Sequence, residues 1–336
     1  MKEITIAVVG ATGAVGQEIL KVIEERKIPY KELKMLASAR SAGTTIDFMG
    51  KTYTVEETTE DSFDGVDVAL FAGGPASRAF GRLAQAKGTV VIDNSSTFRL
   101  EPDVPLVVPE VNPQALKEHK GLIANPNCST ILMVSALYPI YKKSKIKRVI
   151  ISTYQAVSGA GKEAIDELSL QSKQYLAGEE IKPEVFKYQI AYNLIPHIDV
   201  WVEDDYTKEE MKLVYETQKI FGDNEIGITP TAVRVPVFRS HSESIYIETE
   251  EPISPEEARE LLSQAPGVVV MDDPKQNLYP MPLYTSDTDE VYVGRIRKDT
   301  TNDHALNLWA VFDQLRKGAA TNAVQILETL LANDWL

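Results

Sequence analysis

The sequence lacks several features that mark other classes of protein. Its 336 residues include one cysteine, so the chain can form neither an internal disulfide nor a cysteine-rich zinc site. No apolar run approaches the roughly 18 residues of a membrane-spanning helix. Histidine is scarce, with four residues, and no His, Asp and Glu cluster has metal-ligand spacing, which argues against a metal-dependent hydrolase.

Basic charge is also in short supply. The chain has 35 Lys and Arg against 49 Asp and Glu, a formal net charge of -14. Nucleic-acid binders usually present a basic face, so this balance disfavours DNA or RNA as a partner. Small anionic ligands stay possible, because a few arginines can bind them locally. The chain opens Met1-Lys2-Glu3 without an apolar leader, and we expect a cytoplasmic enzyme.

Two kinds of periodicity divide the chain, whose length suggests two domains. Up to about residue 127, short apolar runs such as Ile4–Val9 alternate with helical patterns, which predicts a parallel α/β sheet of Rossmann type. Beyond it, Thr231–Ile247 alternates like an antiparallel strand pair, which predicts an α+β domain. We expect domains at 1–127, joined by a C-terminal helix at about 305–336, and at 128–304.

A glycine-rich turn, Gly10-Ala11-Thr12-Gly13-Ala14-Val15-Gly16, joins the first predicted strand to a helix. Glycines there let the backbone approach a pyrophosphate, whose charge a helix N-terminus favours. The next strand ends Ala37-Ser38-Ala39-Arg40-Ser41, where NAD sites usually place an acid for the ribose 2′-hydroxyl. Because an arginine and two hydroxyls suit a 2′-phosphate instead, we expect NADP as the cofactor.

The single cysteine, Cys128, follows the turn residues Pro126 and Asn127 and precedes a helical pattern. The positive end of a helix dipole lowers a thiol pKa, and the resulting thiolate adds readily to an aldehyde carbon. A lone cysteine can equally be an inert core residue. The nicotinamide site expected on the same chain favours the catalytic interpretation.

Four segments resemble signatures of the aspartate-semialdehyde dehydrogenase family, in the family's order, and the resemblance extends from residue 4 to about residue 330. The segments are Asn125 to Ile131, Gln155 to Lys162, Arg234 to Val237 leading to His241-Ser242-Glu243, and Arg316 to Ala323.

This resemblance implies the reaction and its catalytic residues. The family reduces L-aspartyl 4-phosphate with NADPH to L-aspartate 4-semialdehyde and phosphate, in the biosynthesis of lysine, threonine and methionine. Cys128 would form the thioester, His241 would be the general acid and base, and Gln155 would orient the acyl group. An imidazole titrates near neutral pH, as a proton shuttle must.

The resemblance also implies four substrate-binding residues, and the chemistry of the reaction adds a fifth. Arg234 would bind the α-carboxylate, Glu216 the amino group, and Arg99 and Lys219 the phosphate, while Asn127 could donate to the oxyanion. Glu216 and Lys219 are spaced i, i+3 on a predicted helix, so both can face one site.

The cofactor and the partners complete the expectation. The residues expected to bind NADP are Gly10, Thr12, Gly13, Ala14, Val15, Gly16, Ser38, Arg40, Ser41, Gly73, Ser158, Gly159 and Gln325. The second domain builds the dimer interface in this family, so we expect a homodimer or homotetramer and assign this use to the apolar stretch Gly178–Asp199.

Two alternatives stay open at this point. An N-acetyl-glutamyl-phosphate reductase would share the fold and the Cys/His chemistry, but its nucleophile motif has Gly before the cysteine and Tyr after it, where this chain has Asn127 and Ser129. A non-catalytic NADP-binding regulator is possible on the same fold, because fold does not determine function.

Overall fold

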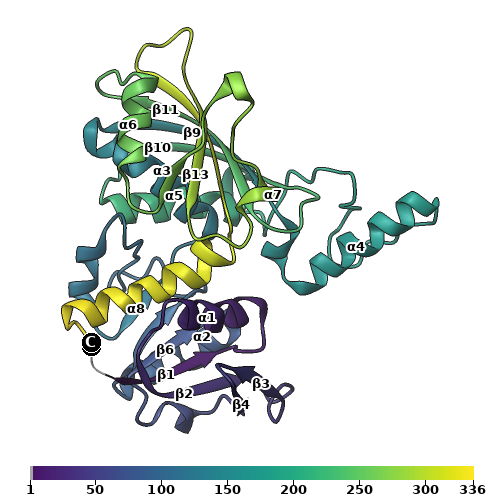
Figure 1. The fold of residues 1–336 in the computed structure, drawn as a ribbon, viewed down its shortest axis with the longest axis vertical. Coiled ribbons are helices and arrows are strands. Elements are labelled where there is room, and N and C mark those ends of the chain that lie inside the picture. Colours follow the sequence, from purple (N-terminus) through teal and green to yellow (C-terminus); the bar gives the residue numbers. More distant parts are fainter. Residues whose placement is uncertain (1–2) are drawn as a thin grey trace. The chain divides into compact units, whose positions relative to one another are not determined.

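The computed structural model describes residues 3–336, and the chain forms two compact units (Figure 1). Unit 1 contains Met1–Asn127 and Gly318–Leu336, and unit 2 contains Cys128–Lys317. Residues 305–317, which the sequence analysis joined to the first domain, belong to unit 2 because Ala305–Phe312 is a strand of its sheet. No helix within residues 3–336 has both the length and the apolar character needed to cross a membrane.

Unit 1 is built on a six-stranded parallel sheet with the strand order β5-β2-β1-β6-β7-β8, which confirms the predicted Rossmann-type architecture. Its strands are β1 (Ile4–Val9), β2 (Tyr30–Ala37), β5 (Glu56–Glu57), β6 (Val68–Phe71), β7 (Val90–Asp93) and β8 (Leu122–Ala124). A separate hairpin joins β3 (Thr45–Phe48) and β4 (Lys51–Thr54). The main helices are α1 (Ala14–Glu25), α2 (Gly74–Ala86) and α8 (Thr321–Asn333).

The C-terminal helix α8 belongs to unit 1 because its apolar side completes the core of that unit. Val324, Leu327 and Leu330 are fully buried in one cluster with residues of β1 and α1. The Asn322 amide at the start of α8 donates to the Val107 carbonyl at 3.0 Å and to Asn125 Oδ1 at 2.6 Å. The last helix of the chain therefore holds the segment that leads into residue 127.

Unit 2 contains a six-stranded mixed sheet with the order β10-β9-β11-β14-β13-β12. Its strands are β9 (Ile146–Gln155), β10 (Gly227–Arg234), β11 (His241–Thr249), β12 (Val268–Val270), β13 (Val291–Lys298) and β14 (Ala305–Phe312). Its helices of eight or more residues are α3 (Cys128–Lys143), α4 (Lys162–Ala177), α5 (Lys208–Phe221) and α6 (Pro255–Ser263), and α7 (Pro282–Thr285) is shorter.

The mixed sheet confirms the predicted α+β character, but the expected antiparallel pairing within Thr231–Ile247 is wrong. Strand β9 lies between β10 and β11, and it pairs with β10 in parallel and with β11 antiparallel. Alternation identifies strands but not their partners, because it depends only on which face is buried. This central position of β9 brings the ends of β9 and β10 and the start of β11 together.

Candidate active site

The glycine-rich turn of unit 1 forms where β1 ends and α1 begins, beside the end of β2. Gly10 has a φ of 86° and its N–H donates to the Leu36 carbonyl at 2.8 Å. A Cβ on Gly16 would lie 2.1 Å from the Gly10 carbonyl oxygen, so the turn closes this tightly only with glycine there. Thr12, Gly13 and Ala14 are exposed, which leaves backbone N–H groups at the helix start accessible to an anion.

The end of β2 carries the residues expected to select the cofactor. Ser38 and Arg40 are exposed, and the Ser41 N–H donates to the Ser38 carbonyl at 2.8 Å, which closes a turn. Gly73 precedes α2 at the end of β6, on the other side of β1. All these residues lie at the carboxyl ends of neighbouring parallel strands, where open α/β sheets bind ligands.

Arg99 lies at the same edge of the parallel sheet and is almost completely buried. Its Nε donates to the Asn125 carbonyl at 2.9 Å and its NH2 to the Asn94 carbonyl at 2.8 Å. Asn127, buried in the same segment, directly precedes the cysteine in the chain. The guanidinium of Arg99 thus holds the backbone segment that leads to Cys128.

Cys128 is the first residue of the 16-residue helix α3 and is half-buried. Its thiol therefore lies at the positive end of a helix dipole, as the sequence predicted. Burial lowers the pKa of Arg234, and the charges of Glu209 and Cys128 partly oppose this shift, so the Cys128 and Arg234 side chains are close enough for their charges to interact. Both effects favour a thiolate on Cys128.

Gln155 and His241 are neighbours across strands β9 and β11, since the adjacent residues Tyr154 and Ser242 pair in the sheet. Gln155 Nε2 lies 3.4 Å from His241 Nε2 and donates to Glu209 Oε1 at 3.1 Å. The Thr153 hydroxyl donates to Gln155 Oε1 at 3.0 Å, which fixes the orientation of the amide.

His241 is fully buried, and its environment favours the neutral ring. Burial, followed by the charge of Arg234, lowers its pKa from 6.5 to about 3. The Ala156 N–H donates to His241 Nδ1 at 3.1 Å, so the proton of the neutral ring is on Nε2. Glu243 shares this face of β11, but burial raises its pKa well above 4.5, so it adds no negative charge behind the ring.

Arg234 ends β10 and is almost completely buried. Its NH1 donates to the Ala156 carbonyl at 2.6 Å, so the backbone of one residue contacts both Arg234 and His241. A Cβ on Gly159 would lie 3.0 Å from Arg234 NH1 and 3.3 Å from His241 Cε1. The absence of a side chain at Gly159 lets this loop pack closely against both groups.

Helix α5 supplies an acid and a base that the sequence analysis did not single out. Glu209 Oε1 accepts from Gln155, and Glu209 Oε2 accepts from Lys212 Nζ at 2.8 Å. Burial lowers the pKa values of Arg234 and His241, and the charge of Glu209 partly opposes both shifts. The expected pair, Glu216 and Lys219, has the same i, i+3 spacing two turns further along α5, where Glu216 is buried.

A glutamine other than the expected one lies at the Ser158 loop. Gln314 Nε2 donates to Ser158 Oγ, and Gln314 Oε1 accepts from the Ser240 N–H at 2.9 Å. The expected residue, Gln325, donates to Glu110 Oε1 at 2.9 Å within unit 1. Gln314 follows β14 by two residues, and a search for ligands at strand ends would have included it.

The class of the protein follows from two models of known families. Residues 5–119 match the model described as semialdehyde dehydrogenase, NAD binding domain, and residues 137–317 match the model described as semialdehyde dehydrogenase, dimerisation domain. Their junction falls in the segment that contains Cys128. The fold and the two matched models define a two-domain oxidoreductase of the semialdehyde dehydrogenase class, with a domain that binds a nicotinamide dinucleotide.

Individual relatives narrow the class to one family. The aspartate-semialdehyde dehydrogenase of Aquifex aeolicus is 57% identical over 97% of both chains, and that of Bacillus subtilis is 51% identical over 97% of this chain and 96% of the relative. The crystal structure of aspartate semialdehyde dehydrogenase II from Vibrio cholerae superposes with a TM-score of 0.96 and 47% identity over all of both chains. The chain belongs to the aspartate-semialdehyde dehydrogenase family. These relatives favour that family over an N-acetyl-glutamyl-phosphate reductase and over a non-catalytic regulator.

Proposed function

We propose that the chain reduces L-aspartyl 4-phosphate to L-aspartate 4-semialdehyde with NADPH, through a thioester on Cys128. The observation that carries this proposal is the convergence in unit 2 of an amide, an imidazole, a guanidinium and a carboxylate. They are Gln155, His241, Arg234 and Glu209. A solved Vibrio cholerae relative, 47% identical, was crystallised as a complex with ASA.

Cys128 begins the proposed reaction. Its thiolate attacks the acyl carbon and the phosphate leaves with the bonding pair, so a thioester forms. A reduced nicotinamide held at the glycine-rich turn would supply the hydride that reduces the thioester carbon. The resulting oxyanion receives hydrogen bonds from Gln155 Nε2 and from the Nε2–H of His241, whose tautomer the Ala156 N–H selects. Expulsion of the Cys128 thiolate releases the aldehyde.

The substrate carries a carboxylate, an amino group and a phosphate, and the site contains a partner for each. Arg234 binds the carboxylate, since a guanidinium can donate two parallel hydrogen bonds. Glu209 binds the amino group and Lys212 the phosphate, because Gln155 donates to Glu209, Lys212 pairs with Glu209, and the charge of Glu209 acts on Arg234. Arg99 and Asn127 keep the predicted phosphate and oxyanion roles.

The first experiment is an assay with aspartate semialdehyde, inorganic phosphate and NADP, following absorbance of the reduced cofactor. We expect phosphate-dependent NADPH formation in the natural protein and a loss of more than about 1,000-fold in Cys128→Ala. His304→Asn is the matched control, because His304 is on an exposed loop of unit 2. Activity that persists in Cys128→Ala contradicts the role of the thiol. Tight NADP binding by the natural protein without turnover contradicts the assignment of aspartate semialdehyde as its substrate.

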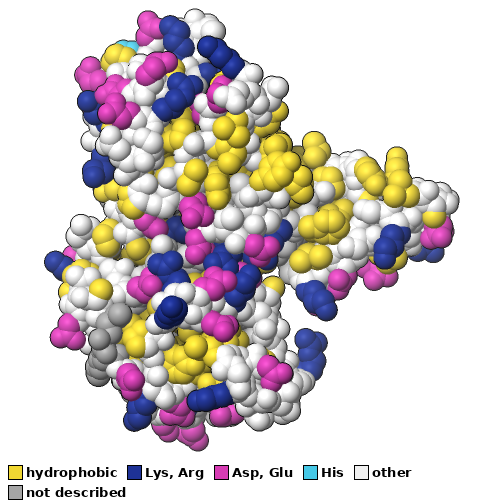
Figure 2. Space-filling view, in the orientation of Figure 1, with side chains coloured by type: hydrophobic (Ala, Val, Ile, Leu, Met, Phe, Trp, Pro, Cys, Tyr) yellow, Lys and Arg dark blue, Asp and Glu magenta, His cyan; other side chains and the backbone are white. Residues whose placement is uncertain are grey.

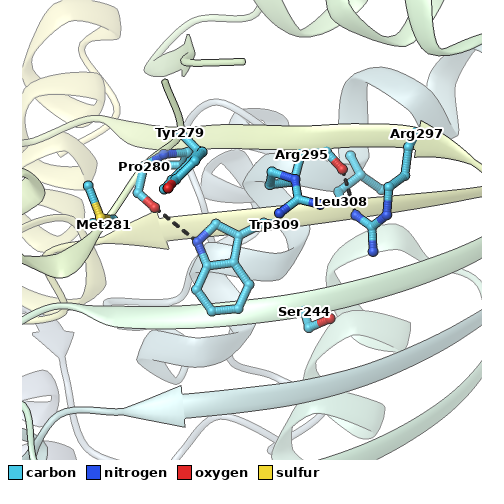
Figure 3. A pocket seen from close by; sticks show the side chains of 8 residues that line it. All are labelled: Ser244, Tyr279, Pro280, Met281, Arg295, Arg297, Leu308 and Trp309. Carbon is cyan, nitrogen blue, oxygen red and sulfur yellow. Dashed lines mark hydrogen bonds between the residues drawn. The ribbon is translucent and has the colours of Figure 1, made fainter. Parts of the chain in front are cut away.

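Two surfaces of unit 2 support the expected oligomer. Helices α3, α5 and α6 pack on one face of the mixed sheet, and the other face presents Trp309 and Tyr154, whose ring centroids are 5.4 Å apart. On that face Trp309 and Ser244, with Arg297, line a pocket (Figure 3), in which the Trp309 indole donates to the Pro280 carbonyl at 3.0 Å. Hydrophobic side chains also gather on the projecting part of unit 2 that carries α4 (Lys162–Ala177), called the arm below (Figure 2).

The arm contains the stretch for which the sequence predicted an interface. Leu176 on α4 is 77% exposed, Tyr192 within the predicted stretch is 59% exposed, and the rings of Tyr175 and Tyr192 lie 4.5 Å apart. Large exposed apolar patches mark interaction surfaces, and residues 137–317 match a dimerisation domain. A second copy of the chain is therefore the proposed occupant of both surfaces.

Solution scattering and light scattering test this assignment. We expect a dimer or tetramer for the natural protein, and a shift toward monomer for Trp309→Glu on the sheet face and for Leu176→Glu on the arm. A natural protein that is only monomeric contradicts the oligomer. Variants that both keep the natural mass contradict the choice of surfaces.

A further inference from the structure

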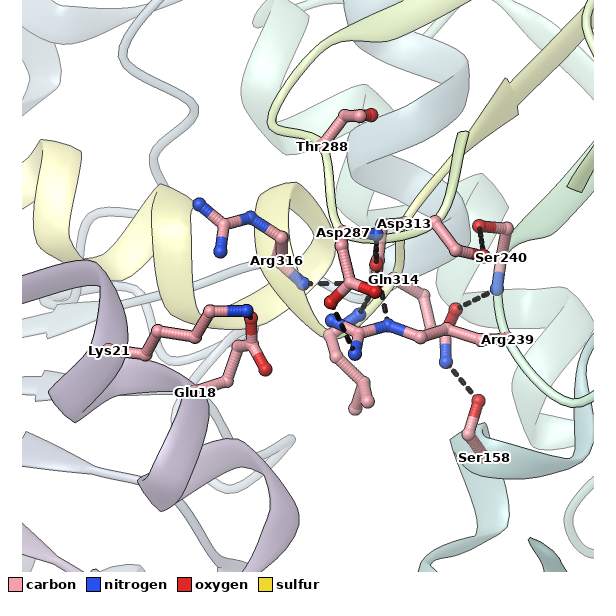
Figure 4. A network of polar contacts seen from close by, with 12 residues as sticks. Glu18, Lys21, Ser158, Arg239, Ser240, Asp287, Thr288, Asp313, Gln314 and Arg316 are labelled. Atoms are coloured by element: carbon pink, nitrogen blue, oxygen red, sulfur yellow. Dashed lines mark hydrogen bonds and ion pairs between the residues drawn. The ribbon is translucent and has the colours of Figure 1, made fainter. Parts of the chain in front are cut away.

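A cluster of charged side chains lies directly before the strand that carries His241 (Figure 4). Arg239 Nε donates to Asp313 Oδ2 at 2.6 Å, and Arg239 NH1 lies 2.9 Å from Asp287 Oδ1. Arg239 precedes His241 by two residues, and Asp313 follows Phe312, which pairs with His241 in the sheet. The ion pair therefore spans strands β11 and β14 at the end where the active site lies.

In addition to its ion pair with Arg239, the Asp313 carboxylate accepts hydrogen bonds from three backbone N–H groups. Its side chain is fully buried, and Oδ2 also accepts the Asp287 N–H at 2.7 Å. Oδ1 accepts the N–H groups of Leu315 at 2.9 Å and Arg316 at 3.3 Å. One carboxylate thus joins Arg239, the loop after α7 and the turn after β14.

Between the ion pair and the catalytic ring lies a residue in an unusual conformation. Ser240 has a φ of 74°, in the left-handed region that residues with a Cβ disfavour. Its N–H donates to Gln314 Oε1 at 2.9 Å, and its hydroxyl lies 2.9 Å from that of Ser286. Such a conformation persists only when the surroundings hold it, and the surroundings here are the turn that Asp313 stabilises.

We propose that Arg239 and Asp313 are positioning residues for the reaction. Their ion pair holds Ser240 in its left-handed turn, and this turn sets the ring of His241 where Nδ1 meets the Ala156 N–H and Nε2 faces the substrate site. The inference rests on the function proposed above, because it assigns work to the same imidazole. Without the ion pair, Ser240 relaxes to an extended conformation, and His241 loses its selected tautomer.

The molecule contains a matched ion pair away from the site. Arg259 Nε donates to Asp272 Oδ2 at 2.8 Å, and Asp272 is also fully buried and accepts the N–H groups of Arg295 and Ile296. The two arginines are similarly exposed, 24% for Arg239 and 31% for Arg259. Arg259→Met therefore measures the structural cost of such a pair without disturbing the turn before His241.

The test compares Arg239→Met, Arg239→Lys and Arg259→Met by kcat, KM and thermal stability. We expect kcat to fall about 100-fold in Arg239→Met, the loss typical of a displacement of about 1 Å in a catalytic group. KM should change little, because Arg234 and Glu209 stay in place. Arg239→Lys should restore part of kcat, and Arg259→Met should lose comparable stability with kcat unchanged.

Nitrogen NMR of the histidine rings provides a readout that a purely structural role does not move. The His241 signals are assigned by their loss in His241→Asn, and we expect the single Nε2–H tautomer in the natural protein and in Arg259→Met, but a tautomer mixture in Arg239→Met. Arg239→Met, Arg239→Lys and Arg259→Met all keep the charged groups around the His241 ring, which are Arg234, Glu209, Lys212 and Cys128.

Three results overturn the proposal. They are a natural kcat in Arg239→Met, an equal loss of kcat in Arg259→Met, and a loss of kcat in Arg239→Met with the tautomer retained. If the natural protein does not turn over aspartate semialdehyde, the proposed function fails. The tautomer comparison still decides whether the ion pair positions the ring.

Discussion

The glycine-rich turn of unit 1 and the proposed catalytic cluster of unit 2, made of Gln155, Glu209, Arg234 and His241, are assembled in opposite ways. The turn is one continuous segment, Gly10 to Gly16, and it presents backbone N–H groups. The cluster takes one side chain each from α5, β9, β10 and β11, and most of its atoms are buried. A site made of contiguous backbone is sensitive to local shape, whereas a site made of distant side chains is sensitive to sheet register and helix phase.

Substitution at Gly16 should cause the largest loss of function in the glycine-rich turn while leaving the cluster of unit 2 unchanged. Gly16→Ala places a Cβ 2.1 Å from the Gly10 carbonyl, so the turn must open. We expect NADP affinity to fall by about 100-fold, or about 2.7 kcal/mol, measured by calorimetry. Alkylation of Cys128 by iodoacetamide should keep its natural rate. A parallel fall in both quantities would show that the two regions are not independent.

Helix α5 carries two acid–base pairs, Glu209 with Lys212 and Glu216 with Lys219, and substitutions can decide which pair serves the cluster of unit 2. Glu209→Gln removes the charge beside Gln155 and Arg234, and we expect kcat/KM for aspartate semialdehyde to fall about 30-fold, near 2 kcal/mol for a charged hydrogen bond. Glu216→Gln, seven residues on, is the control and should keep its activity. The reverse order of effects would return the role to Glu216 and Lys219.

His241 makes the buried cluster, unlike the exposed turn, sensitive to acid. Its pKa is about 3 in the folded protein and 6.5 in the unfolded chain, so between these values the unfolded chain binds more protons and stability falls as the pH is lowered. From pH 7.5 to 5.5 the natural protein should lose about 1.4 kcal/mol more than His241→Asn. Urea titrations at the two pH values measure this, and equal losses would refute a buried neutral ring.

The smallest effect is expected at the exposed end of β2. Arg40→Ala removes the cation expected to bind the 2′-phosphate, and because Arg40 is exposed its contribution is about 1 kcal/mol, or about five-fold in the ratio of NADP to NAD affinity. Binding isotherms with both cofactors measure the ratio. An unchanged ratio would assign the preference to the turn or to other residues.

Two independent features of the sequence predict a catalytic role for Cys128, and fewer support the residues around it. Cys128 is the only cysteine and begins a helix, so residue type and position agree. Gln155, Arg234 and His241 come from matching motifs, and the structure brings them together across β9, β10 and β11. Glu209 was missed because the i, i+3 acid–base spacing occurs twice on α5, seven residues apart, and two turns of one helix face look alike in a linear pattern.

The sequence by itself determined the local elements of this protein: the glycine turn after the first strand, the helix that begins at Cys128 and the strands that form the parallel sheet of unit 1. These depend on backbone conformation and on periodicity over a few residues, which neighbouring residues control. Only the tertiary structure decided that β9 lies between β10 and β11, which turn of α5 meets Gln155, and that Asp313 holds the turn before His241. These contacts join residues 54 to 86 positions apart, and their geometry depends on sheet register and burial.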